Sequence, residues 1–179
     1  LISHENIEEI LEKLHKYFFL LEEGVKDQNI NLWKDMLEES VIIKSWFVLL
    51  DPYDMNGIHK GLSLGHTFAN VIETLMPWFR HWEAVLLWLL MSLHLSIQIY
   101  WNQDLSIIHD WLIQNFNTNY KHLIISRKNI QETLMRDKIS INHKITFVLL
   151  VKLWKHEIIE IENEQLVQDS FNTIFQVYE

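Results

Sequence analysis

The sequence contains no cysteine among its 179 residues. Disulfide bonds, thiolate catalysis and zinc sites built on cysteine are therefore excluded for this chain. Glycine occurs four times and proline twice, well below the usual shares of roughly 7% and 5%. Because both residue types interrupt helices, their scarcity favours a mainly α-helical fold.

Basic residues are scarce as well. Fifteen Lys and Arg stand against 24 Asp and Glu, which gives a formal net charge of −9. A nucleic-acid partner requires clustered basic residues, so we expect no such partner.

Glycine-rich phosphate loops are also absent. Gly57, Gly61 and Gly65 recur at a spacing of four, which matches neither the dinucleotide fingerprint nor the P-loop. No Gly-x-Ser-x-Gly word occurs, so a nucleophilic serine on a strained turn is not predicted. This chain alone should not bind NAD through a Rossmann-type loop.

The hydrophobic content of 49% is sufficient for one sizeable core, so we expect a single domain over residues 1–179. The chain begins with Leu1 and shows no secretory signal, from which we expect a fragment, a processed product or the ordered part of something longer. We expect a cytoplasmic location. Residues 84–101 lack charge and just reach membrane-spanning length. Because Ser92, His94, Ser96 and Gln98 interrupt this run, we interpret it as a buried central helix and expect no membrane partner.

Apolar residues spaced by three and four predict several helices. β-branched and aromatic residues predict a small β-hairpin near residues 144–161, turning near Lys155. The expected fold is therefore a mainly α multi-helix domain with one small hairpin. The predicted helices span residues 3–21, 30–50, 62–76, 82–101, from Asp104 or Ser106 to 115, from Ser126 to about 138, and from Asn163 to about 177.

Two histidines stand where helices are expected to begin. His66 follows Gly65, and His81 follows a short connector that holds Pro77. Imidazoles on neighbouring helices can share one metal ion, because each offers a neutral ring nitrogen at about 2.0–2.1 Å. The structural alternative is a pair of helix-start histidines hydrogen-bonded to backbone. Other histidines, including His94 and His109, lack ligand-like spacing and are predicted to be surface or satisfied core residues.

The words around these histidines carry a resemblance. Residues 65–73 read Gly-His-Thr-Phe-x-x-x-Ile-Glu, and residues 81–85 read His-x-Glu-Ala-Val. This pair of words resembles the C-terminal domain of the 3-dehydroquinate synthase family, the sugar phosphate cyclases. Further ordered matches lie at Lys44, Asp51, Gly57 and His59 upstream, and at Asp137-Lys138-Ile139 downstream.

The resemblance implies a division of labour between two domains. An N-terminal domain, absent from this chain, would bind NAD, and the helical C-terminal domain would supply a divalent metal, zinc or cobalt, and much of the sugar phosphate site. The implied reaction oxidises a secondary alcohol, eliminates phosphate, reduces again and closes a carbocycle. It belongs to the shikimate pathway of aromatic amino acid biosynthesis.

The resemblance also implies the metal ligands. His66 and His81 would be two of them, and the family's third ligand is an upstream glutamate. Glu9 and Glu12 are candidates by chemistry, and a residue outside this chain is an equal alternative.

Substrate contacts follow from the same mapping. Lys44 and Lys138 would contact phosphate or carboxylate as catalytic residues, since a phosphate dianion in a partly dry pocket needs compact positive charge. His59, Ser63 and Asn70 would line the substrate pocket.

Several positions depart from the family pattern and favour a changed substrate or lost catalysis. We therefore keep two alternatives: a degenerate homologue serving as a structural or interaction subunit, in a homodimer or larger assembly, and a protein that binds a sugar phosphate without turnover. The departures are His59 for arginine, Ser63 for asparagine, Asn70 for histidine, Trp82 for glycine, Ile139 for lysine, and Leu87 and Trp88 at positions that are often small.

Overall fold

The computed structural model describes residues 29–53, 55, 63–116, 118–136, 145–153 and 155–178, and only the backbone of Trp82. Residues 1–62 and 63–179 form two compact units, and each is described by itself. The helix predicted over residues 3–21 lies outside the described residues. One domain over residues 1–179 stays a prediction.

The described part of the first unit is dominated by helix α2, Ile30–Leu50. These bounds confirm the predicted helix over residues 30–50. The helix ends before Pro52, as expected from a residue that cannot continue a helix. After it the Asp51 carboxylate accepts a hydrogen bond from the backbone N–H of Met55, at 2.9 Å.

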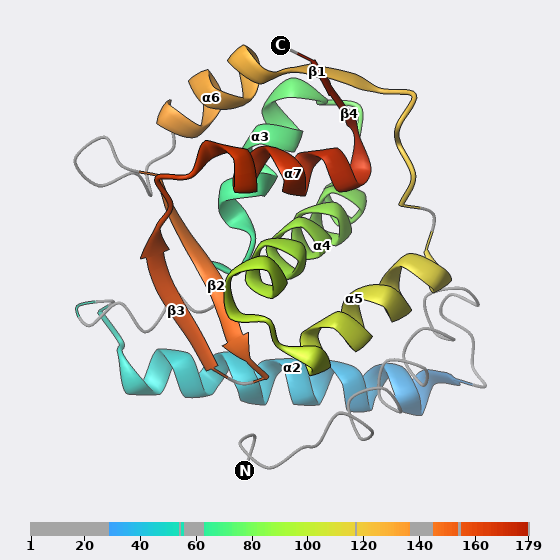
Figure 1. Cartoon of the computed structure of the whole chain (residues 1–179). Helices are drawn as coiled ribbons and strands as arrows, with labels where there is room; N and C mark the ends of the chain where they lie inside the picture. The colour runs from blue at the N-terminus through green and yellow to red at the C-terminus, as the bar shows by residue number, and fades with distance from the viewer. Residues whose placement is uncertain are drawn as a thin grey trace. The chain divides into compact units, whose positions relative to one another are not determined.

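Helix α4, His81–Tyr100, is the central element of the second unit. It packs against helices α3, α5 and α7 and strand β2 (Figure 1). Ala84, Leu90 and Leu95 are completely buried. Residues 83–100 are long and apolar enough to cross a membrane, but half of this stretch is buried inside the structure. The prediction of a buried central helix is therefore confirmed.

Helix α3, His66–Leu75, is amphipathic. Its inward face buries Phe68, Val71 and Ile72 completely. The sequence predicted a helix from residue 62; the structure begins it at His66, because Gly65 adopts a left-handed conformation that cannot belong to a helix.

The predicted hairpin is confirmed. Strand β2, Thr146–Lys152, pairs antiparallel with strand β3, Lys155–Glu160, with Phe147 opposite Ile159. Phe147 is buried and packs on Phe68 of α3, with ring centroids 5.2 Å apart. The hairpin thus supports the inner face of α3.

A second small sheet was not predicted. Strand β1, Ile124–Ser126, pairs in parallel with strand β4, Gln176–Tyr178. Each strand has three residues, too few for a period-two pattern to be recognised in the sequence. The helix predicted to reach residue 177 therefore ends at Ile174.

The remaining helices begin close to the predicted positions, and the cap of α5 differs from those predicted. Helix α5, Gln103–Asn115, is capped by Asn102, whose side chain accepts the N–H groups of Asp104 and Leu105; the predicted caps Asp104 and Ser106 were wrong. Helix α6 is Arg127–Arg136. Helix α7, Glu164–Ile174, is capped by Asn163.

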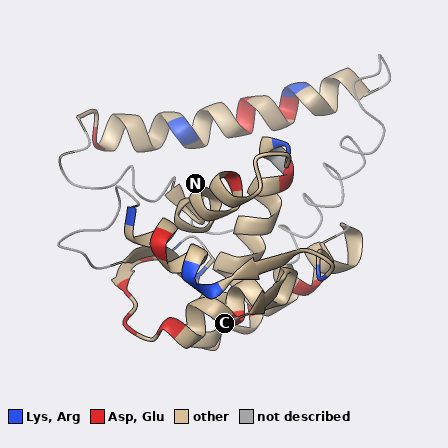
Figure 2. Cartoon of the chain, turned by 90° about the horizontal axis from the view of Figure 1, so that it is seen from above, with Lys and Arg blue, Asp and Glu red and all other residues tan. Residues whose placement is uncertain are grey.

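Six helices and two small sheets among the described residues confirm the mainly α fold class with its hairpin. Figure 2 shows basic and acidic residues interspersed along the described helices and strands. The electrostatic environment of a bound ligand is therefore set by the charged groups close to its site.

Candidate metal site

Gly65 sets the start of α3 against α4. Its φ of +79° is a conformation that glycine adopts without the steric cost borne by other residues. A Cβ at this position would lie 3.0 Å from Ser92 Oγ and 3.1 Å from the carbonyl oxygen of Trp88. The glycine of the Gly-His-Thr word is thus required by both the turn and the close approach of α4. His66 follows as the first residue of α3.

Thr67 links the first turn of α3 to strand β2 of the hairpin. Its buried hydroxyl donates a hydrogen bond to the carbonyl oxygen of Thr146 in β2, at 3.0 Å. The side chain is 4% exposed, so water cannot replace this bond. The first turn of α3 is therefore fixed between α4 and β2, and the backbone of His66 is fixed with it.

Three polar residues share the exposed face of α3. His66, Asn70 and Glu73 are exposed and are separated by four and then three positions, the spacing of neighbours on one helix face. Phe68 and Ile72 lie on the buried face. The word from Gly65 to Glu73 therefore encodes one inward apolar face and one outward polar stripe.

His81 is the first residue of α4. The backbone N–H of Arg80 donates to the Glu83 carboxylate at 2.9 Å, and the N–H of Glu83 donates to the Arg80 carbonyl at 3.0 Å. These two bonds fix the beginning of the helix. The His81 side chain is 76% exposed, so its imidazole is accessible to a ligand.

The two imidazoles meet on one indole. The ring of His66 stacks on Trp88 with centroids 4.8 Å apart and an interplanar angle of 28°. The ring of His81 approaches the same indole edge-on, at 6.0 Å and 77°. Trp88 is 7% exposed, so its indole is held by the core and packs against both imidazole rings. The two histidines predicted to act together therefore lie on the same side of the fold, on neighbouring helices.

Glu73 orients the second imidazole. Its Oε1 lies 2.8 Å from Nδ1 of His81. A carboxylate can only accept a hydrogen bond, so Nδ1 carries the proton. In the neutral ring the lone pair is then on Nε2, the atom available to a metal. A carboxylate bonded to the rear nitrogen of a histidine is the common outer-shell partner of a metal ligand.

The donor set fits a metal only in part. Two imidazoles supply two ligands, whereas catalytic zinc sites keep three protein ligands and an open position. Within the described ranges, no group of three His, Asp or Glu residues is placed to hold a metal ion. A third donor must come from elsewhere. Glu9 and Glu12, the candidates from the sequence, lie outside the described residues.

The predicted substrate residues divide into three groups. Asn70 lies one turn from His66 on the exposed face of α3, and Ser63 lies just before Gly65, partly exposed. Lys44 is exposed on α2, in the other unit. His59 and Lys138 lie outside the described residues, so their predicted roles stay predictions.

Of the departures from the family pattern, two are visible as side chains in α4. Leu87 is 1% exposed and belongs to the core. The indole of Trp88 contacts the imidazoles of both His66 and His81. Ile139 and the Trp82 side chain lie outside the described parts.

Sequence reasoning missed the contacts that Glu73 and Trp88 make with the two histidines, although Trp88 was noted as a departure from the family pattern. Glu73 is the last residue of the Gly-His-Thr word, but its bond to His81 joins residues eight positions apart on two different helices. Trp88 follows His81 by seven positions, which places it on the same face of α4. Both contacts also depend on how α3 packs on α4, which the sequence pattern does not specify.

A second histidine pair was also missed. His94 of α4 and His109 of α5 have ring centroids 6.0 Å apart. Nδ1 of His109 lies 3.3 Å from Oδ1 of Asp110, whereas the buried Nε2 has no hydrogen-bond partner among the described residues. Burial, and then the nearby His109, lower the pKa of His94, while Asp169 acts in the opposite direction.

Comparison with known proteins agrees with the words around the two histidines. Residues 4–140 match the family described as 3-dehydroquinate synthase C-terminal. A 3-dehydroquinate synthase of Alkaliphilus oremlandii is 31% identical over 143 residues, covering 78% of this chain and 39% of that protein.

Two further relatives carry the same name. The 3-dehydroquinate synthase of Campylobacter fetus subsp. fetus is 33% identical over 138 residues, 75% of this chain and 39% of the relative. That of Prochlorococcus marinus subsp. pastoris is 27% identical over 161 residues, 86% of this chain and 44% of the relative. The chain thus spans about two fifths of the length of these curated relatives.

Proposed function

Because the chain belongs to the 3-dehydroquinate synthase C-terminal family, we propose that it is the metal- and substrate-binding part of a sugar phosphate cyclase. The single observation that carries the proposal is the approach of His66 and His81 to one indole, with Glu73 holding the rear nitrogen of His81. Two accessible imidazoles, one already oriented by a carboxylate, are suited to coordinate a divalent cation.

The proposed enzyme needs a second domain. The chain covers about two fifths of its relatives, and its glycine spacing provides no dinucleotide loop. NAD would therefore be held by an N-terminal domain outside this chain, with the reaction at the cleft between them. We place the assembled protein in the cytoplasm, where its sugar phosphate substrate would be found.

His66 and His81 would hold zinc or cobalt, with a third donor from residues 1–28 or from the other domain. When bound, the metal would polarise the oxygen at the reacting carbon of the substrate. Glu73 would keep the His81 proton on Nδ1 and so keep Nε2 directed to the cation. Asn70, in register with His66, would offer an amide to a substrate hydroxyl.

Charge for the phosphate would come from lysine. Lys44 and Lys138 would bind phosphate or carboxylate, and His59 and Ser63 would complete the pocket. In this arrangement the chain binds and orients the substrate, while the hydride is exchanged with NAD on the other domain.

Metal analysis tests the proposal. Purified protein in zinc-replete buffer should hold zinc, and His66→Ala and His81→Ala should each lose it. His156→Ala, which changes a histidine on β3, serves as the matched control. A zinc-free wild type, measured with the completing domain present, would contradict the proposal.

A second function is favoured by a different observation. The indole of Trp88 covers the space below both imidazoles, and no third ligand is placed among the residues in the described ranges. Both features suit a homologue that has lost catalysis and serves as a structural or interaction subunit. Turnover of a seven-carbon sugar phosphate by the assembled domains, in the presence of NAD, separates the two: zinc binding without phosphate release identifies the degenerate form.

A further inference from the structure

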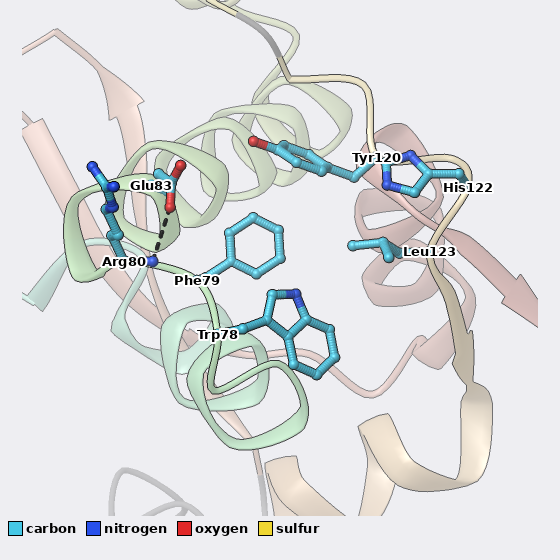
Figure 3. A pocket seen from close by; sticks show the side chains of 7 residues that line it. All are labelled: Trp78, Phe79, Arg80, Glu83, Tyr120, His122 and Leu123. Atoms are coloured by element: carbon cyan, nitrogen blue, oxygen red, sulfur yellow. Dashed lines mark hydrogen bonds between the residues drawn. The ribbon is translucent and has the colours of Figure 1, made fainter.

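A cavity of about 470 Å³ lies between the α3–α4 connection and the segment before β1 (Figure 3). The first wall is formed by Trp78, Phe79, Arg80 and Glu83. The second wall is formed by Tyr120, His122 and Leu123. Its volume falls within the range of roughly 300–1,000 Å³ that is usual for small-molecule sites. Neither His66 nor His81 lines it.

Three aromatic side chains, Trp78, Phe79 and Tyr120, line the cavity beside polar and charged groups. Phe79 and Tyr120 meet edge to face, with centroids 5.0 Å apart. Both rings also contact Phe175, which is completely buried, so this wall is anchored to the core. Trp78 is 65% exposed, and Figure 3 shows Phe79 between it and Tyr120.

The carboxylate of Glu83 lies beside these aromatic rings in the cavity wall. Oε2 of Glu83 accepts the Arg80 N–H, and within the described part of the chain Oε1 has no hydrogen-bond partner. Burial, and then the negative charge of Glu83, raise the pKa of Tyr120, so the field of the carboxylate reaches the opposite wall. The guanidinium of Arg80 points away from the rings (Figure 3).

We propose that this pocket binds a small organic cation, an ammonium group carried on an apolar or aromatic body. Ring faces attract a cation because of their quadrupole, and a carboxylate adds a charge-assisted hydrogen bond. Trp78 supplies an exposed surface for the apolar body. An anionic ligand would be repelled by the Glu83 carboxylate in the first wall and is therefore disfavoured.

Three probes of nearly equal shape test the proposal on the full chain: 2-phenylethylamine, 2-phenylethanol and phenylacetate. Binding is followed by the indole N–H signal of Trp78 in ¹H–¹⁵N spectra, assigned with Trp78→Ala, with a chelator present so that the amine cannot bind a metal. The amine should bind at least roughly tenfold more tightly than the alcohol, the ratio expected for one charge-assisted bond. Phenylacetate should bind more weakly than either.

Glu83→Gln isolates the charge. The glutamine oxygen can still accept the Arg80 N–H, so α4 keeps its cap while the negative charge is lost. Affinity for the amine should fall to that of the alcohol, and affinity for the alcohol should not change. Glu132→Gln, at an exposed position of α6, is the control for loss of one charge.

Two results would overturn the proposal. One is a wild-type protein that binds the alcohol or phenylacetate as tightly as the amine, or binds no amine. The other is a folded Glu83→Gln variant with an unchanged amine-to-alcohol ratio. The probe series on the wild type decides the question even if Glu83→Gln fails to fold.

Discussion

Glu73 on α3 and His81 on α4 are joined by a contact of 2.8 Å between Oε1 and Nδ1. The contact links the two words that carry the family resemblance, across the connection between their helices. Because the carboxylate fixes the proton on Nδ1, it determines which nitrogen His81 presents. Glu73 is therefore a positioning residue, acting through His81.

Replacing Glu73 by Gln should weaken zinc binding. The amide still reaches His81 but carries no charge, and loss of an outer-shell partner costs roughly 10- to 100-fold in metal affinity. Zinc affinity is measured by competition with a chromophoric chelator. Glu132→Gln serves as the control and should bind zinc like the wild type; equal affinity of all three proteins would show that Glu73 does not act on a metal site.

Gly65→Ala should destabilise the second unit by about 1–3 kcal/mol, because a side chain is strained at positive φ and the new Cβ meets α4. Urea unfolding followed by circular dichroism gives the free energy of unfolding. Ser92→Ala removes the hydroxyl 3.0 Å from the new Cβ, a group without a hydrogen-bond partner in the described part of the chain. The double variant should regain part of the loss, since the Trp88 carbonyl still crowds the site; purely additive losses would contradict this packing.

Thr67→Val should cost about 1 kcal/mol, the usual net value of one hydrogen bond. The isosteric side chain keeps the volume but cannot donate to the Thr146 carbonyl. Thr67→Ser keeps the hydroxyl and is the matched control. In urea unfolding, a serine variant less stable than the valine variant would show that volume, not the hydrogen bond, matters here.

Much of this architecture could be predicted from the sequence because it rests on periodicity. The helix over residues 30–50 and the long apolar helix followed directly from apolar spacing. The pairing of β1 with β4 could not be predicted, because it joins three-residue strands about 50 positions apart through backbone bonds alone. Likewise the start of α3 depends on the φ of Gly65, which the apolar pattern does not encode.

The candidate site, too, could be predicted from the sequence only in part. His66 and His81 were found because the words around them have a fixed order. The stacking of both rings on Trp88 depends on the angle between α3 and α4, which spacing within either helix does not determine. His94 and His109 were overlooked for the same reason, since they meet only when α5 packs on α4.

The His94–His109 pair should make stability depend on pH. Burial, and then His109, lower the pKa of His94 in the folded chain, below the value of about 6.5 expected when unfolded. Between these two pKa values the unfolded chain binds more protons, so stability rises with pH there. The contribution of His94 to the free energy of unfolding should be complete above pH 6.5 and should decrease as the pH falls below this value. The opposing charge of Asp169 on α7 reduces this effect but does not reverse it.

Urea unfolding at several pH values measures this dependence. His94→Gln should flatten the slope below pH 6.5, whereas His156→Gln on the hairpin should leave it close to that of the wild type. An unchanged slope in His94→Gln would contradict the role given to this pair.

The central claim is that His66 and His81 hold one metal ion together. It is tested most directly by titrating cobalt into the assembled protein and into His66→Ala, His81→Ala and the double variant, followed by visible absorption. The account predicts one ion per chain in the wild type, a loss at least as large as that of Glu73→Gln in each single variant, and little further loss in the double variant. A single variant that binds cobalt as tightly as the wild type would contradict the account, because the two imidazoles would then not share an ion.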